Sequence, residues 1–220
     1  MTWLKDLKMN YKFYYIRFIR YKNKYGIVNS FKRIGEKLYQ SIFQRDDYVF
    51  YSDLALLKEQ IINLPERISV EQIERREQIN EIYFMSLSNH IGEEILSIQL
   101  KNRFSVSATL WIIKAGEDLA GYVWSIGKSK FGPYYMPIGE NDVFIFDGAV
   151  LEKYRGKNIF PMLLSTVLFT LKEYGVNRAI VDAHEWNVSV HKSFFIVGAK
   201  ILGIVRKYKI GNNAYLIWKG

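Results

Sequence analysis

Two basic residues flank a glycine at the point where an apolar strand is expected to give way to a helix. Arg155 and Lys157 carry full positive charges, and Gly156 between them adds no side-chain bulk. The first N–H groups of a helix have no partner inside it, and the helix dipole adds partial positive charge there. Such a turn suits a pyrophosphate. An ordinary turn with two solvated basic side chains has the same composition, so the motif alone leaves both interpretations open.

Hydrophobic patterning predicts the elements on either side of this turn. Residues 143–150 are apolar and β-branched or aromatic except for Asp147 and Gly148, which indicates a buried strand. After the turn, apolar residues recur at helical spacing, with Pro161 in the first helical turn and Gly175 just beyond the last. The predicted unit is therefore a strand, a tight turn and a helix.

Three side chains near the predicted turn could accept a proton. Asp147 interrupts an apolar strand, where burial would make its carboxylate a better base; alternatively, this carboxylate stabilises a bulge. His184 and Glu185 end the next predicted strand, 178–185, where ligands of such sheets collect, and alternation places the two on opposite faces. A lone histidine is more often a hydrogen-bonded structural residue, so this alternative also stays open. No two histidines have the spacing of metal ligands, and we expect no catalytic metal.

Two segments carry a resemblance to a known family. The run from Val150 to Ile159 resembles the acyl-CoA-binding signature of the GNAT superfamily of N-acyltransferases, in which a strand valine precedes Arg-Gly-x-Gly-x-Gly/Ala. The run from Asn187 to Ala199 resembles a later Asn…Gly-Phe segment of that family, at the expected spacing. The resemblance extends over about residues 105–218, and before that it rests on the order of elements only.

The resemblance implies a fold, a reaction and a set of site residues. The fold is α+β, a central twisted mixed sheet of about seven strands flanked by helices. The reaction moves an acetyl group from acetyl-CoA to a primary amine of a small molecule, such as an amino sugar in surface-polysaccharide synthesis. A backbone N–H at a bulge in 148–150 would hold the developing oxyanion. The residues expected at the coenzyme are Ala149, Val150, Arg155, Gly156, Lys157, Asn158, Ile159, Phe160 and Asn187.

The sequence also departs from the family pattern. Asn158 and Phe160 stand where glycines are usual, and Phe160 would have to point away from the phosphates. Phe194 replaces the tyrosine that often donates a proton, and Ala199 replaces a phenylalanine. Two alternatives therefore stay open: a catalytically silent module that binds CoA, and a membrane-associated transferase of long acyl chains or amino acids. The general acid is not assigned; the candidates are solvent, Tyr134, Tyr135 and Tyr154.

The net charge of +9 lies entirely in the first 45 residues, which hold eleven Lys or Arg and two acidic residues. Aromatic and basic residues alternate up to residue 25, and a short amphipathic helix is predicted over 30–45. Three interpretations remain: an extension packed on the domain, an anchor for anionic lipid, and contact with nucleic acid or an anionic substrate. We expect nucleic acid to be the weakest of these.

Composition bounds the remaining properties. The chain has no cysteine, which excludes disulfides, thiolate metal sites and a cysteine nucleophile. No segment reaches the roughly 18 to 20 apolar residues that span a bilayer. We expect a cytoplasmic protein with a basic extension, 1–45, that could lie at the inner membrane surface, followed by an acyltransferase domain, 46–220. The oligomeric state is not indicated.

The other elements are assigned by periodicity and turn signals. The predicted order is β-α-α-β-β-β-α-β-α-β-β. The first helix is expected to begin at Ser69, with Gln72 completing a capping box. Residues 127–141 form a loop that could be a lid over the acceptor or a structural connection. The remaining predicted elements are strands at 48–54, 107–114, 120–126, 199–209 and 214–219 and helices at 89–101 and 187–198.

Overall fold

The computed structural model describes residues 45–57, 59, 61–128, 138–210 and 213–220. These residues form two compact units: one contains residues 46–205 and 217–220, and the other takes in Arg45, 206–210 and 213–216. Every feature of the site described below lies in the first unit. The basic extension, the helix expected over 30–45 and the 129–137 part of the predicted lid lie outside the described residues.

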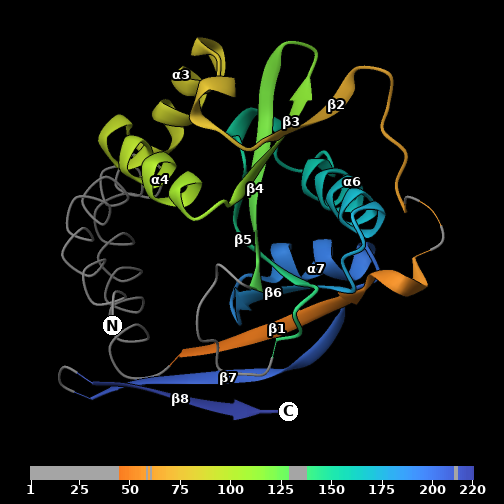
Figure 1. The fold of residues 1–220 in the computed structure, drawn as a ribbon, viewed down its shortest axis with the longest axis vertical. Helices are drawn as coiled ribbons and strands as arrows, with labels where there is room; N and C mark the ends of the chain where they lie inside the picture. Colours follow the sequence, from red (N-terminus) through yellow and green to blue (C-terminus); the bar gives the residue numbers. More distant parts are fainter. Residues whose placement is uncertain (1–44, 58, 60, 129–137, 211–212) are drawn as a thin grey trace. The chain divides into compact units, whose positions relative to one another are not determined.

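A mixed sheet forms the centre of the fold (Figure 1), and in the described residues it has eight strands in the order β2-β3-β4-β5-β6-β1-β7-β8. Neighbouring strands pair antiparallel from β2 to β5 and between β6 and β1, while β5 and β6 are parallel. The strands are β1 (Arg45–Asp53), β2 (Ile68–Ile73), β3 (Thr109–Ala115), β4 (Asp118–Gly127), β5 (Asp142–Val150), β6 (Arg178–His184), β7 (Lys200–Ile210) and β8 (Asn213–Lys219).

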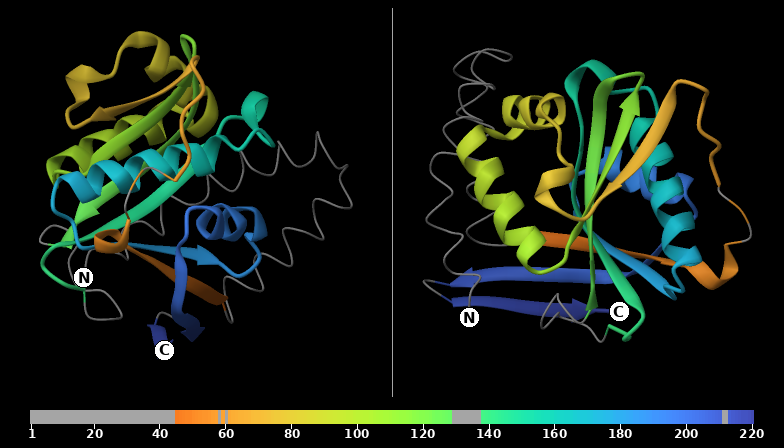
Figure 2. Two further views of the ribbon diagram at one scale, coloured as in Figure 1. Left: turned by 90° about the vertical axis from the view of Figure 1, so that its right-hand side faces the viewer. Right: turned by 45° about the horizontal axis from the view of Figure 1, so that its top comes forward.

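Helices cover both faces of this sheet. The helices α3 (Glu81–Ile91) and α4 (Glu93–Ser105) lie on one face, and α6 (Ile159–Glu173) and α7 (Val188–Ile196) lie on the other (Figures 1 and 2). Three short 3-10 turns complete the described elements: η1 (Leu54–Leu56), η2 (Arg76–Gln78) and η3 (Glu152–Tyr154). The expected class, a mixed sheet flanked by helices, is confirmed.

The two faces bury separate hydrophobic cores. On the α6 and α7 side, Leu163, Leu164 and Val167 pack against strand residues such as Ile145 and Val181. The helix α6 alone buries eight of its residues, and each fully buried aliphatic side chain contributes about 1.5–3 kcal/mol. This helix is therefore held firmly, and so is the turn that leads into it.

The core on the other face fixes which strand positions point toward α3 and α4. It contains Leu87 and Leu100 from the helices and Phe144 and Ile180 from the strands. Because side chains alternate along a strand, even-numbered positions of β6 face α3 and α4, and odd-numbered positions face α6 and α7. This assignment places His184 on the α3 and α4 face.

The helix expected at Ser69 is wrong, because residues 68–73 form the strand β2, which pairs antiparallel with β3. Ser69 and Gln72 do have the spacing of a capping box. The β-branched residues Ile68, Val70 and Ile73 nevertheless favour a strand, and the edge of β3 would have no partner without β2. The first helix instead begins after Asn80, whose side chain accepts a hydrogen bond from the Tyr83 amide at 2.9 Å. The extra strand raises the described count from about seven to eight.

Candidate active site

The turn between β5 and α6 presents a row of backbone amides. Gly156 and Asn158 adopt left-handed backbone angles, with φ of 77° and 55°. Asparagine tolerates that region better than most residues, which explains how Asn158 stands where a glycine is usual. Residues 155–158 form a turn that leads into α6, and the amides of the first helical residues have no partner within the helix. A Cβ added to Gly156 would meet nothing within 4 Å, so the turn is open on this side.

The neighbouring η3 turn is anchored to the β3–β4 hairpin through one carboxylate. Asp118 accepts hydrogen bonds from Lys153 Nζ at 2.6 Å and from the Tyr154 hydroxyl at 2.7 Å. These partners hold the pKa of Asp118 below its usual value, while burial and then Asp118 raise the pKa of Tyr154. Lys153 is thus engaged with Asp118, whereas Arg155 uses its Nε to donate to the Val150 carbonyl at 3.3 Å. Tyr154 therefore serves as an anchor and is poorly suited to donate its proton.

A bulge interrupts β5 beside this turn. Trp124 pairs with Phe146 and Tyr122 pairs with Ala149, so the two residues Asp147 and Gly148 lie opposite a single residue of β4. Asp147 has a φ of 45°, which is a left-handed conformation. The sequence placed a bulge within 148–150, and the structure places it one residue earlier. A two-against-one bulge turns backbone groups out of the ladder.

An arginine from α4 holds the bulge. Arg103 Nη2 lies 2.6 Å from Asp147 Oδ2, and the Arg103 guanidinium carbon lies 4.9 Å from the Trp124 ring centroid and 5.3 Å from that of Phe146. The Asp147 side chain is 40 % exposed, so the expectation of a buried carboxylate at this position is wrong. The bulge rotates it out of the core. This geometry favours the bulge-stabilising alternative, while a role of Asp147 as a base stays a prediction.

His184 forms a pair with a buried aspartate that the sequence analysis missed. His184 Nδ1 lies 2.6 Å from Asp47 Oδ1, across the antiparallel β1–β6 ladder in which the two residues are direct partners. The Asp47 side chain is 1 % exposed and that of His184 is 32 % exposed. The Trp186 ring, itself 45 % exposed, lies with its centroid 4.8 Å from the imidazole. The only signal in the sequence that could have pointed to Asp47 as a buried residue is the alternation of hydrophobic residues along β1.

Glu185 lies just beyond the end of β6, and its amide donates to the Asp46 carbonyl at 3.1 Å. Because Glu185 lies in the turn after the strand, its position on the face opposite His184 stays a prediction. Asn187 occupies the N-cap of α7, but its side chain makes no capping hydrogen bond. Its amide instead donates to the His184 carbonyl at 2.8 Å, which closes the turn after β6.

The parallel ladder between β5 and β6 is short. The paired residues run only from Asp142–Arg178 to Ile145–Val181, although both strands continue beyond them. Asp147, at the bulge of β5, and His184, the last residue of β6, therefore both lie beyond the point where the two strands pair. The open ends, the bulge and the turn all lie at the same end of the sheet, the carboxyl end of its two parallel strands, where ligands of such sheets bind.

Phe160 does not cover the turn, and its ring lies against the bulge. A Cβ added to Gly148 would come within 2.6 Å of a ring carbon of Phe160. The Phe160 ring centroid also lies 6.3 Å from that of Phe194, which is 3 % exposed. That Phe160 would point away from the phosphates stays a prediction. The ring nevertheless fills the space between β5 and α7 next to the open strand ends.

Comparison with known proteins settles the family. The profile of the "Acetyltransferase (GNAT) family" matches residues 75–194, which is more than half of the chain. The chain belongs to the GNAT acetyltransferase family. No curated protein matches it.

Solved structures of GNAT proteins share this fold at low identity. An acetyltransferase of the GNAT family from Colwellia psychrerythraea is 15 % identical, with a TM-score of 0.55. The match covers 76 % of this chain and 57 % of the Colwellia chain. A tandem GNAT protein from the clavulanic acid biosynthesis pathway is 15 % identical with a TM-score of 0.52, covering 84 % and 56 %. The chain thus spans little more than half the length of these structures.

A third structure is described as a GCN5-related glucosamine N-acetyltransferase region in a fungal multi-domain GH3 β-N-acetylglucosaminidase. It is 13 % identical with a TM-score of 0.54, and the match covers 81 % of this chain and 22 % of that one. At these identities the likeness shows the fold alone.

The residues of this GNAT chain fit the diphosphate of a coenzyme. The amides of 156–160 supply donors, Gly156 leaves room for close approach, and Arg155 and Lys157 supply charge. Ile159 is 4 % exposed, so only its amide is available to a ligand. Ala149 and Val150 follow the bulge and pack toward opposite faces of the sheet. Residues 149–160 lie along the segment that forms this corner, whereas Asn187 is at the N-cap of α7; the contacts of all these residues with acetyl-CoA stay predictions.

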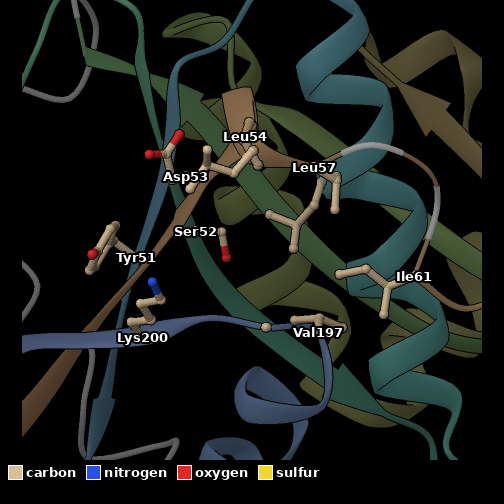
Figure 3. A pocket seen from close by; sticks show the side chains of 11 residues that line it. Tyr51, Ser52, Asp53, Leu54, Leu57, Ile61, Val197 and Lys200 are labelled. Atoms are coloured by element: carbon tan, nitrogen blue, oxygen red, sulfur yellow. The ribbon is translucent and has the colours of Figure 1, made fainter.

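Other features lie away from this corner. A cavity of about 210 Å³ opens near the other end of α6, between η1 and the start of β7 (Figure 3); Leu168, Asp53 and Lys200 are among the residues that line it. No residue of the predicted site lines it. In the described part of the chain, no group of three His, Asp or Glu side chains could hold a metal ion, and no helix is long and apolar enough to cross a membrane. Tyr134 and Tyr135 lie outside the described residues.

Proposed function

We propose that this protein transfers an acetyl group from acetyl-CoA to a primary amine of a small molecule. The observation that carries the proposal is the corner after β5, where the amides of a turn and of a helix start lie beside a strand bulge and the open ends of two parallel strands. Amides at a helix start bind the diphosphate, and the bulge provides an amide that has left the ladder. These are the two binding functions that acyl transfer from a thioester requires.

The reaction assigns a task to each part of the site. The turn fixes the coenzyme, and the open strand ends bring the thioester carbonyl to the bulge at Gly148. The acceptor nitrogen forms a bond to the carbonyl carbon while a bulge N–H holds the oxyanion, and the C–S bond then breaks to release thiolate. Before the attack, His184 takes one proton from the acceptor ammonium; after it, the nitrogen loses its second extra proton to solvent, and solvent protonates the thiolate. Asp147 and Glu185 remain the other candidate bases.

The face that carries His184 suggests the acceptor. Trp186 presents an exposed ring next to the imidazole, and Asp182 lies on the same face of β6. An aromatic ring offers a flat apolar surface to the face of a sugar, and a carboxylate attracts an ammonium group. The description of the fungal neighbour as a glucosamine N-acetyltransferase makes glucosamine the first acceptor to test. We therefore favour an amino sugar over a linear polyamine.

A second candidate function is a module that binds CoA without turnover. It is favoured by Phe194, which has no proton to donate, and by the Phe160 ring, which lies against the bulge where the acyl group would reach it. In this case the coenzyme would bind and stabilise the fold, but no amine would be acetylated. A peripheral contact of residues 1–45 with anionic membrane also stays a proposal; co-sedimentation with anionic vesicles, with and without these residues, tests it.

One assay separates the candidates. Because the chain has no cysteine, a thiol reagent detects only CoA released by the reaction. The full chain is mixed with acetyl-CoA and with glucosamine, galactosamine, spermidine or tyramine, and N-acetylglucosamine serves as the blocked control. Calorimetry measures binding of acetyl-CoA, CoA and a long-chain acyl-CoA. Thiol release that needs a free amine supports the transferase, and binding without release supports the module. Binding of none of the three ligands overturns both.

Variants then identify the base. His184→Gln, Glu185→Gln and Asp147→Asn each replace one candidate by a neutral side chain of similar size. Loss of a general base typically lowers the rate by about 10²–10⁴-fold without preventing binding. We expect His184→Gln to lose kcat in this range while its affinity for acetyl-CoA is kept. Full activity of His184→Gln would remove His184 from the mechanism.

A further inference from the structure

The buried partner of His184 is the strongest feature that the proposed reaction has not used. Asp47 is almost fully buried, with 1 % of its side chain exposed, and one of its carboxylate oxygens lies 2.6 Å from His184 Nδ1. Burying a carboxylate is costly unless hydrogen-bond donors accompany it. The two residues are 137 positions apart in the chain, and the β1–β6 ladder brings them directly opposite each other.

This contact determines which imidazole nitrogen carries the proton. A carboxylate accepts hydrogen bonds and offers none, so the nitrogen that faces Asp47 must be the protonated one. In the neutral imidazole this leaves a lone pair on Nε2, the nitrogen that does not face Asp47. The histidine would then be ready to accept a proton at Nε2, and the resulting imidazolium would lie next to a negative charge.

The surroundings also fix the orientation of the ring. The backbone on either side is closed by two hydrogen bonds, from the Glu185 amide to the Asp46 carbonyl and from the Asn187 amide to the His184 carbonyl. The Trp186 ring lies against the imidazole at an interplanar angle of 44°. A base must be held in one orientation to be efficient, and the carboxylate, the turn and the aromatic ring do this together.

We propose that Asp47 is a positioning residue, which holds His184 in the tautomer with a proton on Nδ1 and a lone pair on Nε2. In the transfer step Nε2 takes one proton from the acceptor ammonium, and the amine then forms its bond to the acyl carbon. The nitrogen loses its second extra proton to solvent as the C–S bond breaks and the thiolate leaves, and the imidazolium later loses its proton to solvent. Asp47 touches neither substrate nor coenzyme in this scheme. The proposal rests on the proposed function for its purpose, but the tautomer exists without any substrate.

The first test therefore needs no reaction. Nitrogen-15 spectra of the full chain, labelled in its three histidines, report which ring nitrogen is protonated, and His184→Gln assigns the signals. We expect the wild-type His184 to be the Nδ1–H tautomer in its neutral form. In Asp47→Asn the carboxamide can turn its N–H toward the ring, and we expect the Nε2–H tautomer. A wild-type ring protonated on Nε2, or an unchanged tautomer in Asp47→Asn, overturns the proposal, and the wild-type spectrum decides even where the variant does not fold.

Kinetics provide the second test. We expect Asp47→Asn to lower kcat by about a hundredfold, at the low end of the range for general-base catalysis, with the KM for acetyl-CoA unchanged. Asp46→Asn is the matched control, because it makes the same change one residue earlier on the opposite face of β1. Equal kcat values for the two variants overturn the positioning role. If His184 has the predicted tautomer but the protein acetylates no amine, the result contradicts the proposed function and not the positioning of His184.

Discussion

Three substitutions at Asp147 separate the two forces that maintain the β5 bulge. Asp147→Asn keeps a short polar side chain and removes only the charge that pairs with Arg103. Asp147→Gly and Asp147→Ala both remove the carboxylate, but only alanine must hold a φ of 45° with a Cβ. Asparagine and glycine tolerate this region, whereas other residues lose roughly 1–2 kcal/mol there.

The structure gives the size of each expected effect. The Arg103 side chain is 17 % exposed and that of Asp147 is 40 % exposed. The pair therefore lies between a screened surface ion pair, about 0–1 kcal/mol, and a charge-assisted hydrogen bond, about 1.5–3 kcal/mol. We expect Asp147→Asn to lower the free energy of unfolding by about 1 kcal/mol. Asp147→Ala should lose about 1 kcal/mol more than Asp147→Gly, because the strain of alanine exceeds the extra chain entropy of glycine.

Urea denaturation of the full chain measures all four proteins under one condition. Arg103→Lys serves as the matched control, since it keeps the positive charge and removes the planar group that stacks near Trp124 and Phe146. Equal stabilities of the alanine and glycine variants would refute the strained bulge. Wild-type stability of Asp147→Asn would show that the ion pair contributes nothing, and Arg103 would then need another explanation.

Three further predictions follow from other parts of the site. Gly148→Ala should destabilise the protein by about 1–3 kcal/mol, because its Cβ would meet the Phe160 ring at 2.6 Å, and adding Phe160→Leu should recover stability in urea denaturation; no recovery would contradict this contact. Arg155→Gln should weaken CoA binding about tenfold by calorimetry, with a smaller dependence on salt, whereas Lys153→Gln should weaken it less, because Lys153 is engaged elsewhere. Asp118→Asn should be less stable than wild type at pH 7. Because the pKa of Asp118 is lowered in the folded state, its contribution is lost as the pH falls through that lowered value, so the difference should close in acid; a difference that persists there would refute the assignment.

The predictable parts of the fold are those set by neighbouring residues. The β5–α6 unit followed from apolar periodicity, Pro161 and Gly175, and the structure has Gly175 at a φ of 78° just beyond the helix. The strand β2 was mistaken for a helix because a capping pattern is local, whereas the edge of β3 that pairs with Ser69 and its neighbours is not. Local signals therefore identified the corner of the site but misassigned an edge of the sheet.

The details of the site depend on contacts that no local pattern records. The register of the bulge is decided by pairing with β4, so the sequence could place it only to within a residue. Asp47 appeared as an ordinary acidic residue, because its partner His184 is 137 positions away. Arg103 likewise meets Asp147 only once α4 lies across the sheet. Sequence reasoning could name the histidine, but it could not name the residues that orient its surroundings.

The brevity of the β5–β6 ladder bears on how the empty protein moves. Past Ile145 and Val181 the two strands form no further described pairs, so backbone pairing between β5 and β6 is limited to four residue pairs, although both hydrophobic cores span the two strands. The unpaired ends of these strands can therefore open locally while the cores stay packed. Acetyl-CoA carries amide groups along an extended arm. One molecule bound along the edges of β5 and β6 would hydrogen-bond to both strands and hold their ends together. Deuterium uptake at the ends of β5 and β6 should then fall when the coenzyme is present.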